Sequence, residues 1–175
     1  MNELNEVTEC YYDLDNYQNQ AMTLAVYRGD VRIAYPTLGL IEEVGELLEC
    51  ATDNSELLVK EMGDVMWYAS AVCSDLGIKL SEAWKEPKVQ LIPDVEALYK
   101  NAFRCAGRVK KILRGDDGRE DKVKEVRGLV GDIVRRIEVL AGQYGSSLQE
   151  VCETNLDKLF DRKDRGVLRG DGDNR

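Results

Sequence analysis

Two runs of residues with helical spacing, joined by a polar turn, make up the stretch from Leu38 to Tyr68. In each run the apolar residues recur every three or four positions, which is typical of a helix that buries one face. The apolar stripe is Leu40, Ile41, Val44, Leu47 and Leu48 in the first run, and Leu58, Met62, Val65, Ala69 and Val72 in the second. The stretch therefore predicts a pair of antiparallel helices around which the rest of the chain packs.

Four carboxylates follow the same spacing. Glu43 and Glu46 are three residues apart on the first predicted helix, and Glu61 and Asp64 are three apart on the second. Residues at i and i+3 share a helix face, so the two pairs are expected to meet beside the apolar stripes and to bind one divalent cation. The alternative is that they are ordinary solvated acids. We disfavour it because both pairs border the predicted core and Glu42 adds a fifth negative charge, which repels the others unless a cation is present.

The protein contains no histidine. Ligands that are all oxygen favour Mg²⁺, or Mn²⁺, over zinc.

The segments LGLIEEVGEL and KEMGDVMWY resemble the EExxE…ExxD signature of the all-α nucleotide pyrophosphohydrolases of the MazG type. The upstream DLDNYQNQAMT and the C-terminal NLDKLFDRKDRGVLRGDGDNR also resemble that family, so the similarity extends over most of the chain. The resemblance implies an all-α fold and Mg²⁺ held by the four carboxylates. It also implies hydrolysis of a nucleoside triphosphate, with a deoxynucleotide expected, to the monophosphate and pyrophosphate.

The base that takes a proton from the attacking water is expected to be Glu42 or one of the metal-binding carboxylates. A triphosphate also needs cations around it, and Lys158 and Arg162 lie four apart on one face of the last predicted helix. The full set of candidate phosphate ligands is Lys110, Lys111, Arg114, Lys158, Arg162 and Arg165. Asn155 is expected to bind sugar or phosphate, and Tyr68 to stack on the base or sugar. The alternative is that the cations are solvated surface residues and that Tyr68 lies at the rim of the core.

The net charge of −9 argues against binding to polymeric nucleic acid. The charge is distributed unevenly, because residues 1–93 hold 17 acidic and 6 basic side chains while residues 94–175 hold 16 and 18. The acidic part contains the predicted metal site, and the basic part is expected to face an anion.

The two parts also resemble each other. The segment Gly63-Asp64-Val65 matches Gly131-Asp132-Ile133, and the segment 77–82 matches 145–150 at the same offset. We therefore predict an antiparallel helical bundle of two pseudo-symmetric halves, an intrachain pseudo-dimer, with units at 1–84 and 94–175 joined by a linker at 85–93. The second unit has lost most of the acids, so it is expected either to supply cations to a single site or to serve as scaffold. Further homo-oligomerisation is left open.

The expected helices end at residues that favour helix termini. Thr37 is expected to cap the second helix, Ser147 the last one, and Gly77 and Gly145 are expected to terminate the helices that precede them. The predicted helices run over 13–28, from 38 to the turn at 52–55, from that turn to about 76, from a cap at Ser81 to 84, from a cap at Asp94 to about 113, over about 120–144, and from the cap at Ser147 to about 163.

Five cysteines without metal-ligand spacing are expected to be reduced thiols, and no run of eighteen apolar residues is present. The sequence therefore predicts a soluble, cytoplasmic protein without a membrane partner. Two other functions stay open besides the hydrolase: a non-catalytic nucleotide-binding or regulatory module, and a purely structural helical protein.

Overall fold

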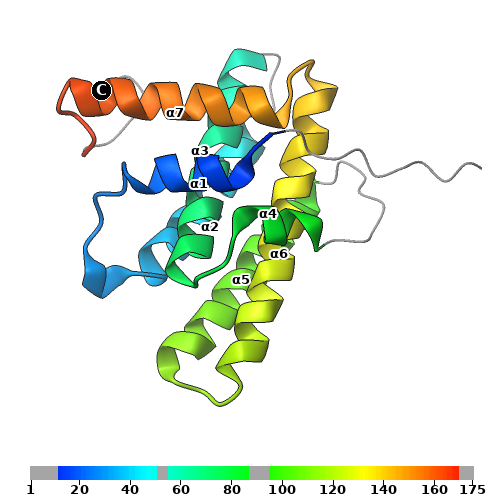
Figure 1. The fold of residues 1–175 in the computed structure, drawn as a ribbon. Coiled ribbons are helices and arrows are strands. Elements are labelled where there is room, and N and C mark those ends of the chain that lie inside the picture. Colours follow the sequence, from blue (N-terminus) through cyan, green and yellow to red (C-terminus); the bar gives the residue numbers. More distant parts are fainter. Residues whose placement is uncertain (1–11, 51–54, 87–94, 170–175) are drawn as a thin grey trace, which may run out of the picture.

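The computed structural model describes residues 12–50, 55–86 and 95–169, and all regular structure in these ranges is helical (Figure 1). The prediction of an all-α fold is confirmed. The elements are α1 (Leu14–Met22), the short 3₁₀ helix η1 (Gly29–Val31), α2 (Ala34–Glu49), α3 (Ser55–Asp75), α4 (Leu80–Lys85), α5 (Val95–Arg114), α6 (Arg119–Gln143) and α7 (Leu148–Asp164). Within these ranges, none of the helices has the length and apolar character needed to cross a membrane.

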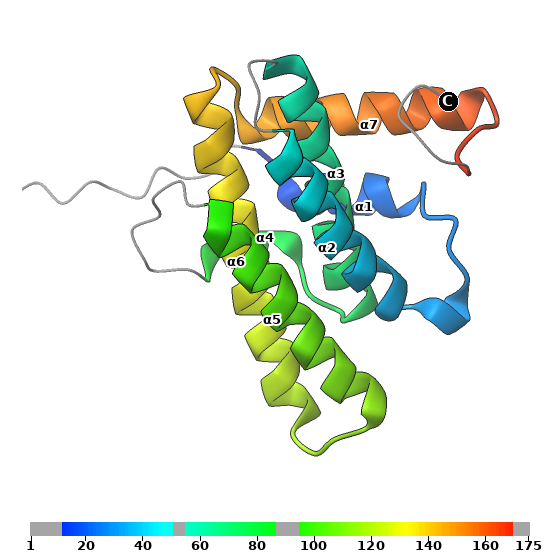
Figure 2. The same ribbon diagram turned by 180° about the vertical axis from the view of Figure 1, so that it is seen from behind.

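Two helical hairpins form the body of the molecule. Helices α2 and α3 make one, α5 and α6 make the other, and α2 lies against α5 while α3 lies against α6 (Figure 2). Helix α7 crosses one end of this body over α3 and α1, and the loop between α5 and α6 lies at the opposite end (Figures 1 and 2). One contiguous core joins both hairpins, with Leu40, Met62, Ile133 and Val151 all fully buried. The molecule is therefore held together by burial of apolar faces that neither hairpin covers alone.

The shared core bears on the predicted division into two units. Because α2 packs on α5, the two hairpins are not separated by a solvent-filled boundary. Most of the predicted linker, from residue 87 onward, lies outside the described residues. The duplication and the unit boundaries at 84 and 94 stay predictions.

Helix α1 is shorter than the predicted range 13–28. It ends at Met22, and the chain then continues through a loop in which the hydroxyl of Tyr27 donates to Asp75 at the C-terminal end of α3. The prediction of continuous helix to residue 28 was wrong, because this long-range contact competes with the local helical spacing of Leu24 and Ala25.

Helix α2 begins earlier than predicted, so Thr37 is not its N-cap. The helix starts at Ala34, directly after Ile33, whose φ of +66° lies in the left-handed region. The Thr37 hydroxyl instead donates 2.6 Å to the carbonyl oxygen of Ile33, inside the first turn.

Three further predicted helix ends, at Gly77, Gly145 and Ser147, agree with the structure, whereas Ser81 lies inside α4, which starts at Leu80. Gly77 and Gly145 adopt φ values of +71° and +75° directly after α3 and α6, a conformation that costs glycine little. The Ser147 hydroxyl accepts a 3.1 Å hydrogen bond from the backbone N–H of Glu150 and so caps α7. These local signals need no tertiary partner, which is why the sequence shows them.

Candidate metal and nucleotide site

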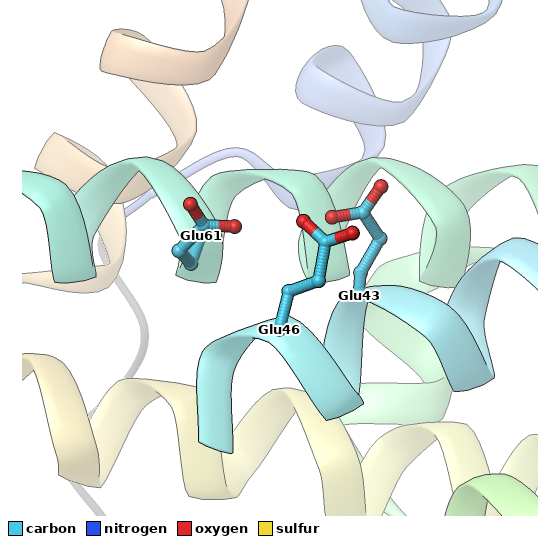
Figure 3. A group of neighbouring side chains, drawn as sticks. All are labelled: Glu43, Glu46 and Glu61. Atoms are coloured by element: carbon cyan, nitrogen blue, oxygen red, sulfur yellow. The ribbon is translucent and has the colours of Figure 1, made fainter. Parts of the chain in front are cut away.

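Three carboxylates meet between α2 and α3. Glu43 and Glu46 point from α2 toward α3, where Glu61 meets them (Figure 3). One oxygen of each residue lies within 4.8 Å of an oxygen of the other two. Glu46 is exposed, Glu43 is half-buried, and Glu61 is only 7 % exposed. We call these three residues the acidic cluster.

The cluster follows from how the two helices pack. Leu40, Val44 and Leu47 on α2 are buried, so residues that flank this stripe are held at its rim rather than in open solvent. On α3 the stripe that includes Met62 and Val65 is buried in the same way. Packing the two stripes against each other therefore brings the flanking carboxylates together, as helical spacing requires.

The charges of the cluster are incompletely compensated. Burial, and then the negative charges of Asp64, Glu46 and Glu61, raise the pKa of Glu43 to about 8, while Lys158 acts in the opposite direction. A raised carboxyl pKa means that the site disfavours another negative charge. A hard divalent cation such as Mg²⁺ would relieve this repulsion, and carboxylate oxygens are the ligands that it prefers. The donor set therefore fits such a cation.

Asp64, the fourth predicted metal ligand, lies outside the group of three but close enough to influence Glu43. Its carboxylate accepts a 3.0 Å hydrogen bond from Asn155 Nδ2 and a 2.5 Å charged hydrogen bond from Lys158 Nζ. Both donors come from α7, and both charged side chains are less than one-fifth exposed. Helix α7 thus holds Asp64 as a carboxylate beside the acidic cluster.

A hydroxyl group in the core fixes the orientation of Asn155. The Tyr17 hydroxyl donates 2.9 Å to Asn155 Oδ1, which leaves Nδ2 to face Asp64. Burial raises the pKa of Tyr17 well above its usual range, so the hydroxyl stays protonated. Gly63 allows the close approach of the two helices, since a Cβ at that position would lie 2.9 Å from Asn155 Cβ. Four residues from α1, α3 and α7 therefore depend on one another here.

A cleft of about 850 Å³ opens beside these groups. Glu42, Glu43, Glu46 and Asp64 form its acidic side. The other walls carry four aromatic side chains and three arginines, namely Tyr27, Tyr35, Trp67, Tyr68, Arg28, Arg162 and Arg169. A cleft with carboxylates on one side, and with cations and flat apolar rings on the others, suits a ligand that combines phosphates with a planar group.

Comparison with known proteins agrees with this geometry. The family model of the MazG nucleotide pyrophosphohydrolase domain matches residues 36–88. The chain belongs to the MazG family. It is also 41 % identical over 80 residues to the Gene 37 protein of Mycobacterium phage L5, a match that covers 45 % of this chain and 70 % of that protein. No solved structure matches the chain.

The matched MazG segment contains all the acids of the site but not all of its partners. It spans most of α2 and the whole of α3 and α4, and so includes Glu42, the acidic cluster and Asp64. Helix α7, which supplies Asn155, Lys158 and Arg162, lies beyond it. These three residues reach the site only through tertiary packing of α7 on α3.

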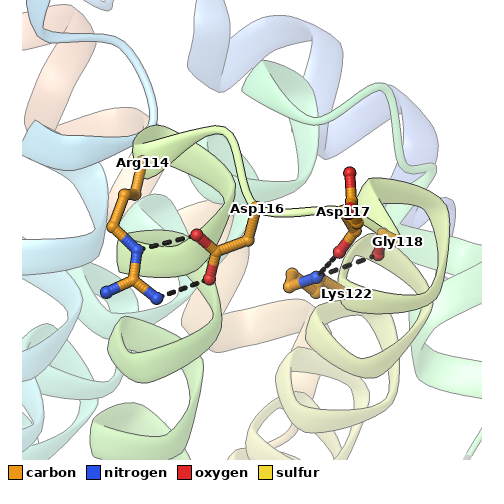
Figure 4. A network of polar contacts seen from close by, with 5 residues as sticks. All are labelled: Arg114, Asp116, Asp117, Gly118 and Lys122. Carbon is orange, nitrogen blue, oxygen red and sulfur yellow. Dashed lines mark hydrogen bonds and ion pairs between the residues drawn. The ribbon is translucent and has the colours of Figure 1, made fainter.

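Several of the predicted phosphate ligands of this MazG chain do not line the cleft. Among the described residues, the lining of the cleft includes Arg162 but not Lys110, Lys111, Arg114 or Arg165. Arg114 donates 2.7 Å and 2.6 Å bonds to the two carboxylate oxygens of Asp116 in the loop between α5 and α6 (Figure 4). That loop lies at the end of the molecule opposite α7. Arg165 contacts Asp161 at 2.7 Å on the surface of α7.

The reason lies in how α5 packs. Its first turns pack against α2, since Tyr99 lies 3.9 Å from the position of a Cβ on Gly45. Lys110 and Lys111 follow Tyr99 by three helical turns on α5. This basic segment therefore lies away from the acidic cluster.

Several residues that line the cleft were not expected from the sequence. Tyr27 and Arg28 lie in the loop after α1, Tyr35 lies in the first turn of α2, and Arg169 follows α7. Arg169 donates 3.3 Å to the carbonyl oxygen of Val26, which brings the C-terminal segment to the loop after α1. The basic C-terminal segment was a usable signal for Arg169, but a loop without periodicity offers none for Tyr27 or Arg28.

Proposed function

We propose that this protein hydrolyses a nucleoside triphosphate, with a deoxynucleoside triphosphate favoured, in a Mg²⁺-dependent reaction that yields the monophosphate and pyrophosphate. The observation that carries the proposal is the convergence of Glu43, Glu46 and Glu61 within 4.8 Å at the edge of a cleft of about 850 Å³. Membership of the MazG family supports the same reaction class.

The acidic cluster, with Asp64 beside it, is the proposed binding site for Mg²⁺, which Mn²⁺ would also fit. A bound divalent cation would neutralise phosphate charge and make a water more acidic. Glu42 is exposed, lines the cleft and is the proposed acceptor of the proton of that water. The water oxygen forms a bond to phosphorus, the α–β phosphoanhydride bond breaks, and pyrophosphate leaves with the electron pair of that bond.

The residues of α7 are proposed to act on the phosphates and on Asp64. Lys158 and Asn155 hold the carboxylate of Asp64 in place through two hydrogen bonds. Arg162 lines the cleft one turn further along the same helix and suits bidentate contact with a phosphate group. Arg28 and Arg169 also line the cleft, and their positive charge would offset the repulsion between the acidic side of the cleft and a triphosphate.

The test is a substrate panel. The purified protein is incubated with each of the eight common ribo- and deoxyribonucleoside triphosphates and Mg²⁺ or Mn²⁺, and the products are separated by chromatography. Release of pyrophosphate is expected from at least one of them, and Glu46→Gln is expected to lower it by at least a hundredfold. Glu49→Gln, an exposed neighbour on the same helix, is the matched control. Stepwise release of orthophosphate, or no cleavage in any reaction, would overturn the proposal.

One observation favours a second candidate, a nucleotide-binding module without catalysis. Asp64 is already engaged by Lys158 and Asn155, and among the described residues the mutual group of carboxylates consists of Glu43, Glu46 and Glu61. In that case nucleotides would raise the melting temperature of the protein without being consumed. The same substrate panel, combined with thermal unfolding, separates the two functions. Homo-oligomerisation and a cytoplasmic location stay predictions.

A further inference from the structure

Four aromatic side chains make a continuous wall of the cleft. Tyr27 stacks on Tyr35 with ring centroids 5.2 Å apart, and Trp67 meets Tyr68 edge-to-face at 4.9 Å. The two pairs are joined, since Tyr27 lies 6.3 Å from Trp67 and Tyr35 lies 6.1 Å from Tyr68. All four rings line the cleft. We call Tyr27, Tyr35, Trp67 and Tyr68 the aromatic wall.

The aromatic wall is not simply part of the core. Tyr35 is 43 % exposed, although it is a large apolar side chain, and Tyr27, Trp67 and Tyr68 are only half-buried. Tyr68 lies one helical turn after Asp64 on α3, and both line the cleft, so the wall adjoins the acids. Aromatic rings that face a cleft at this position offer a stacking surface for a planar heterocycle.

The rings of Trp67 and Tyr68 are fixed by the helices behind them. The indole N–H of Trp67 donates 3.2 Å to the carbonyl oxygen of Ala21. Tyr68 lies directly against the backbone of α2, because a Cβ on Gly39 would fall 2.1 Å from its ring. The hydroxyl oxygens of Tyr35 and Tyr68 are 3.4 Å apart, so the edge of the wall carries two polar groups that suit the polar edge of a base.

Tyr27 and Tyr35 depend on a different residue, Asp75. Its side chain, which is 2 % exposed, lies at the C-terminal end of α3, outside the lining of the cleft. It accepts 2.8 Å from the backbone N–H of Ile33 and 3.2 Å from the hydroxyl of Tyr27, and it pairs with Arg32 at 3.2 Å. Ile33 has a φ of +66°, which is costly for a β-branched residue and persists only where the surroundings enforce it. Asp75 therefore holds the loop that connects Tyr27 to Tyr35.

We propose that the aromatic wall is the nucleobase subsite of the cleft and that Asp75 is the positioning residue that sets its Tyr27–Tyr35 half. The inference rests on the proposed function and makes it more specific. The substrate class becomes a nucleotide whose base stacks on the wall, in preference to a polyphosphate without a base. Asp75 does not contact the substrate and acts through the loop.

The first test compares wild type, Tyr35→Leu and the control Tyr144→Leu, which replaces another exposed tyrosine at the end of α6. Each is assayed for hydrolysis of the preferred triphosphate and of inorganic tripolyphosphate. Each is also titrated calorimetrically with nucleoside monophosphates in the presence of EDTA. Tyr35→Leu is expected to raise KM roughly tenfold with kcat nearly unchanged, and to weaken monophosphate binding by a similar factor. Tyr144→Leu is expected to match wild type, and tripolyphosphate is expected to be a poor substrate.

The second test addresses Asp75. Asp75→Asn keeps the size of the side chain but removes its charge, and it is expected to raise KM several-fold while kcat stays close to wild type. In the Tyr35→Leu background the same substitution should add little, because both changes disturb one wall. A general loss of structure would instead lower kcat in both backgrounds, and that result would overturn the positioning role.

The outcomes separate this inference from the proposed function. If wild type releases pyrophosphate but Tyr35→Leu leaves KM and monophosphate binding unchanged, the subsite is wrong and the hydrolase stands. Efficient cleavage of tripolyphosphate by wild type would have the same meaning. If wild type cleaves no triphosphate yet binds monophosphates in a Tyr35-dependent manner, the hydrolase fails and the subsite stands.

Discussion

Lys158 Nζ lies 2.5 Å from Asp64 Oδ2, although 94 residues separate the two in the sequence. The contact joins α7 to α3 and places an ammonium group that lowers the raised pKa of Glu43. Lys158 thus does in part what a bound cation would do, since both bring positive charge to a group of carboxylates. We therefore expect the metal-free stability of the protein and its proposed binding of Mg²⁺ to depend on the same charges.

Removing the ammonium group should make that dependence visible. Lys158→Met is expected to lower the free energy of unfolding of the metal-free protein by about 1–3 kcal/mol, because Asp64 then loses a charged hydrogen bond while like charges remain beside it. It should also increase the rise in melting temperature caused by Mg²⁺, since the cation replaces the lost charge. Thermal unfolding with EDTA and with Mg²⁺ measures both. Lys163→Met, an exposed lysine on the same helix, serves as control, and an unchanged metal-free stability would contradict the expectation.

Neutralising a buried acid should have opposite effects with and without metal. Glu61→Gln removes a carboxylate whose charge repels its acidic neighbours, so the metal-free protein is expected to become more stable by roughly 1 kcal/mol. The same change removes a proposed ligand, so stabilisation by Mg²⁺ should fall sharply. Calorimetric melting in both conditions tests this, with Glu56→Gln on the exposed face of α3 as the matched variant. A less stable metal-free Glu61→Gln would contradict the expectation that charge repulsion dominates at this position.

Glu43 predicts how stability depends on pH in the absence of metal. Burial, and then the neighbouring Asp64, Glu46 and Glu61, raise its pKa to about 8, against 4.5 for the free side chain. A carboxyl whose pKa is raised in the folded state binds its proton more tightly there than in the unfolded chain. The free energy of unfolding should therefore fall as pH rises from about 4.5 to about 8. Denaturant titrations in EDTA across this range should show that decline, and Glu43→Gln should flatten it.

Tyr17 tests whether the orientation of Asn155 matters. Tyr17→Phe removes the hydroxyl that donates to Asn155 Oδ1, so the amide is no longer held with Nδ2 toward Asp64. We expect a loss of about 1 kcal/mol in stability and a drop in pyrophosphate release that exceeds what this loss explains. Tyr144→Phe, on an exposed tyrosine, is the control. Wild-type turnover in Tyr17→Phe would show that packing of α7 alone orients Asn155.

The sequence by itself determined the all-α fold, most of the helix ends and the meeting of the carboxylates from α2 and α3. These features depend on helical periodicity, on glycines with positive φ such as Gly77 and Gly145, and on the side-chain cap of Ser147. The helical periodicity, the glycines and the cap are local signals, because spacing along a helix fixes which residues share a face. The cluster of Glu43, Glu46 and Glu61 follows once two such helices pack side by side.

Only the tertiary structure decided which distant residues complete the site. It brought Lys158 and Asn155 to Asp64, placed Tyr27 and Arg28 in the cleft, and left Arg114 paired with Asp116 at the opposite end. The spacing of charges within one helix does not predict which other helix will pack across that helix. A loop such as residues 23–33 has no hydrophobic period from which its contacts could be inferred. Its course is set by Asp75, whose carboxylate outweighs the local preference for continuing α1.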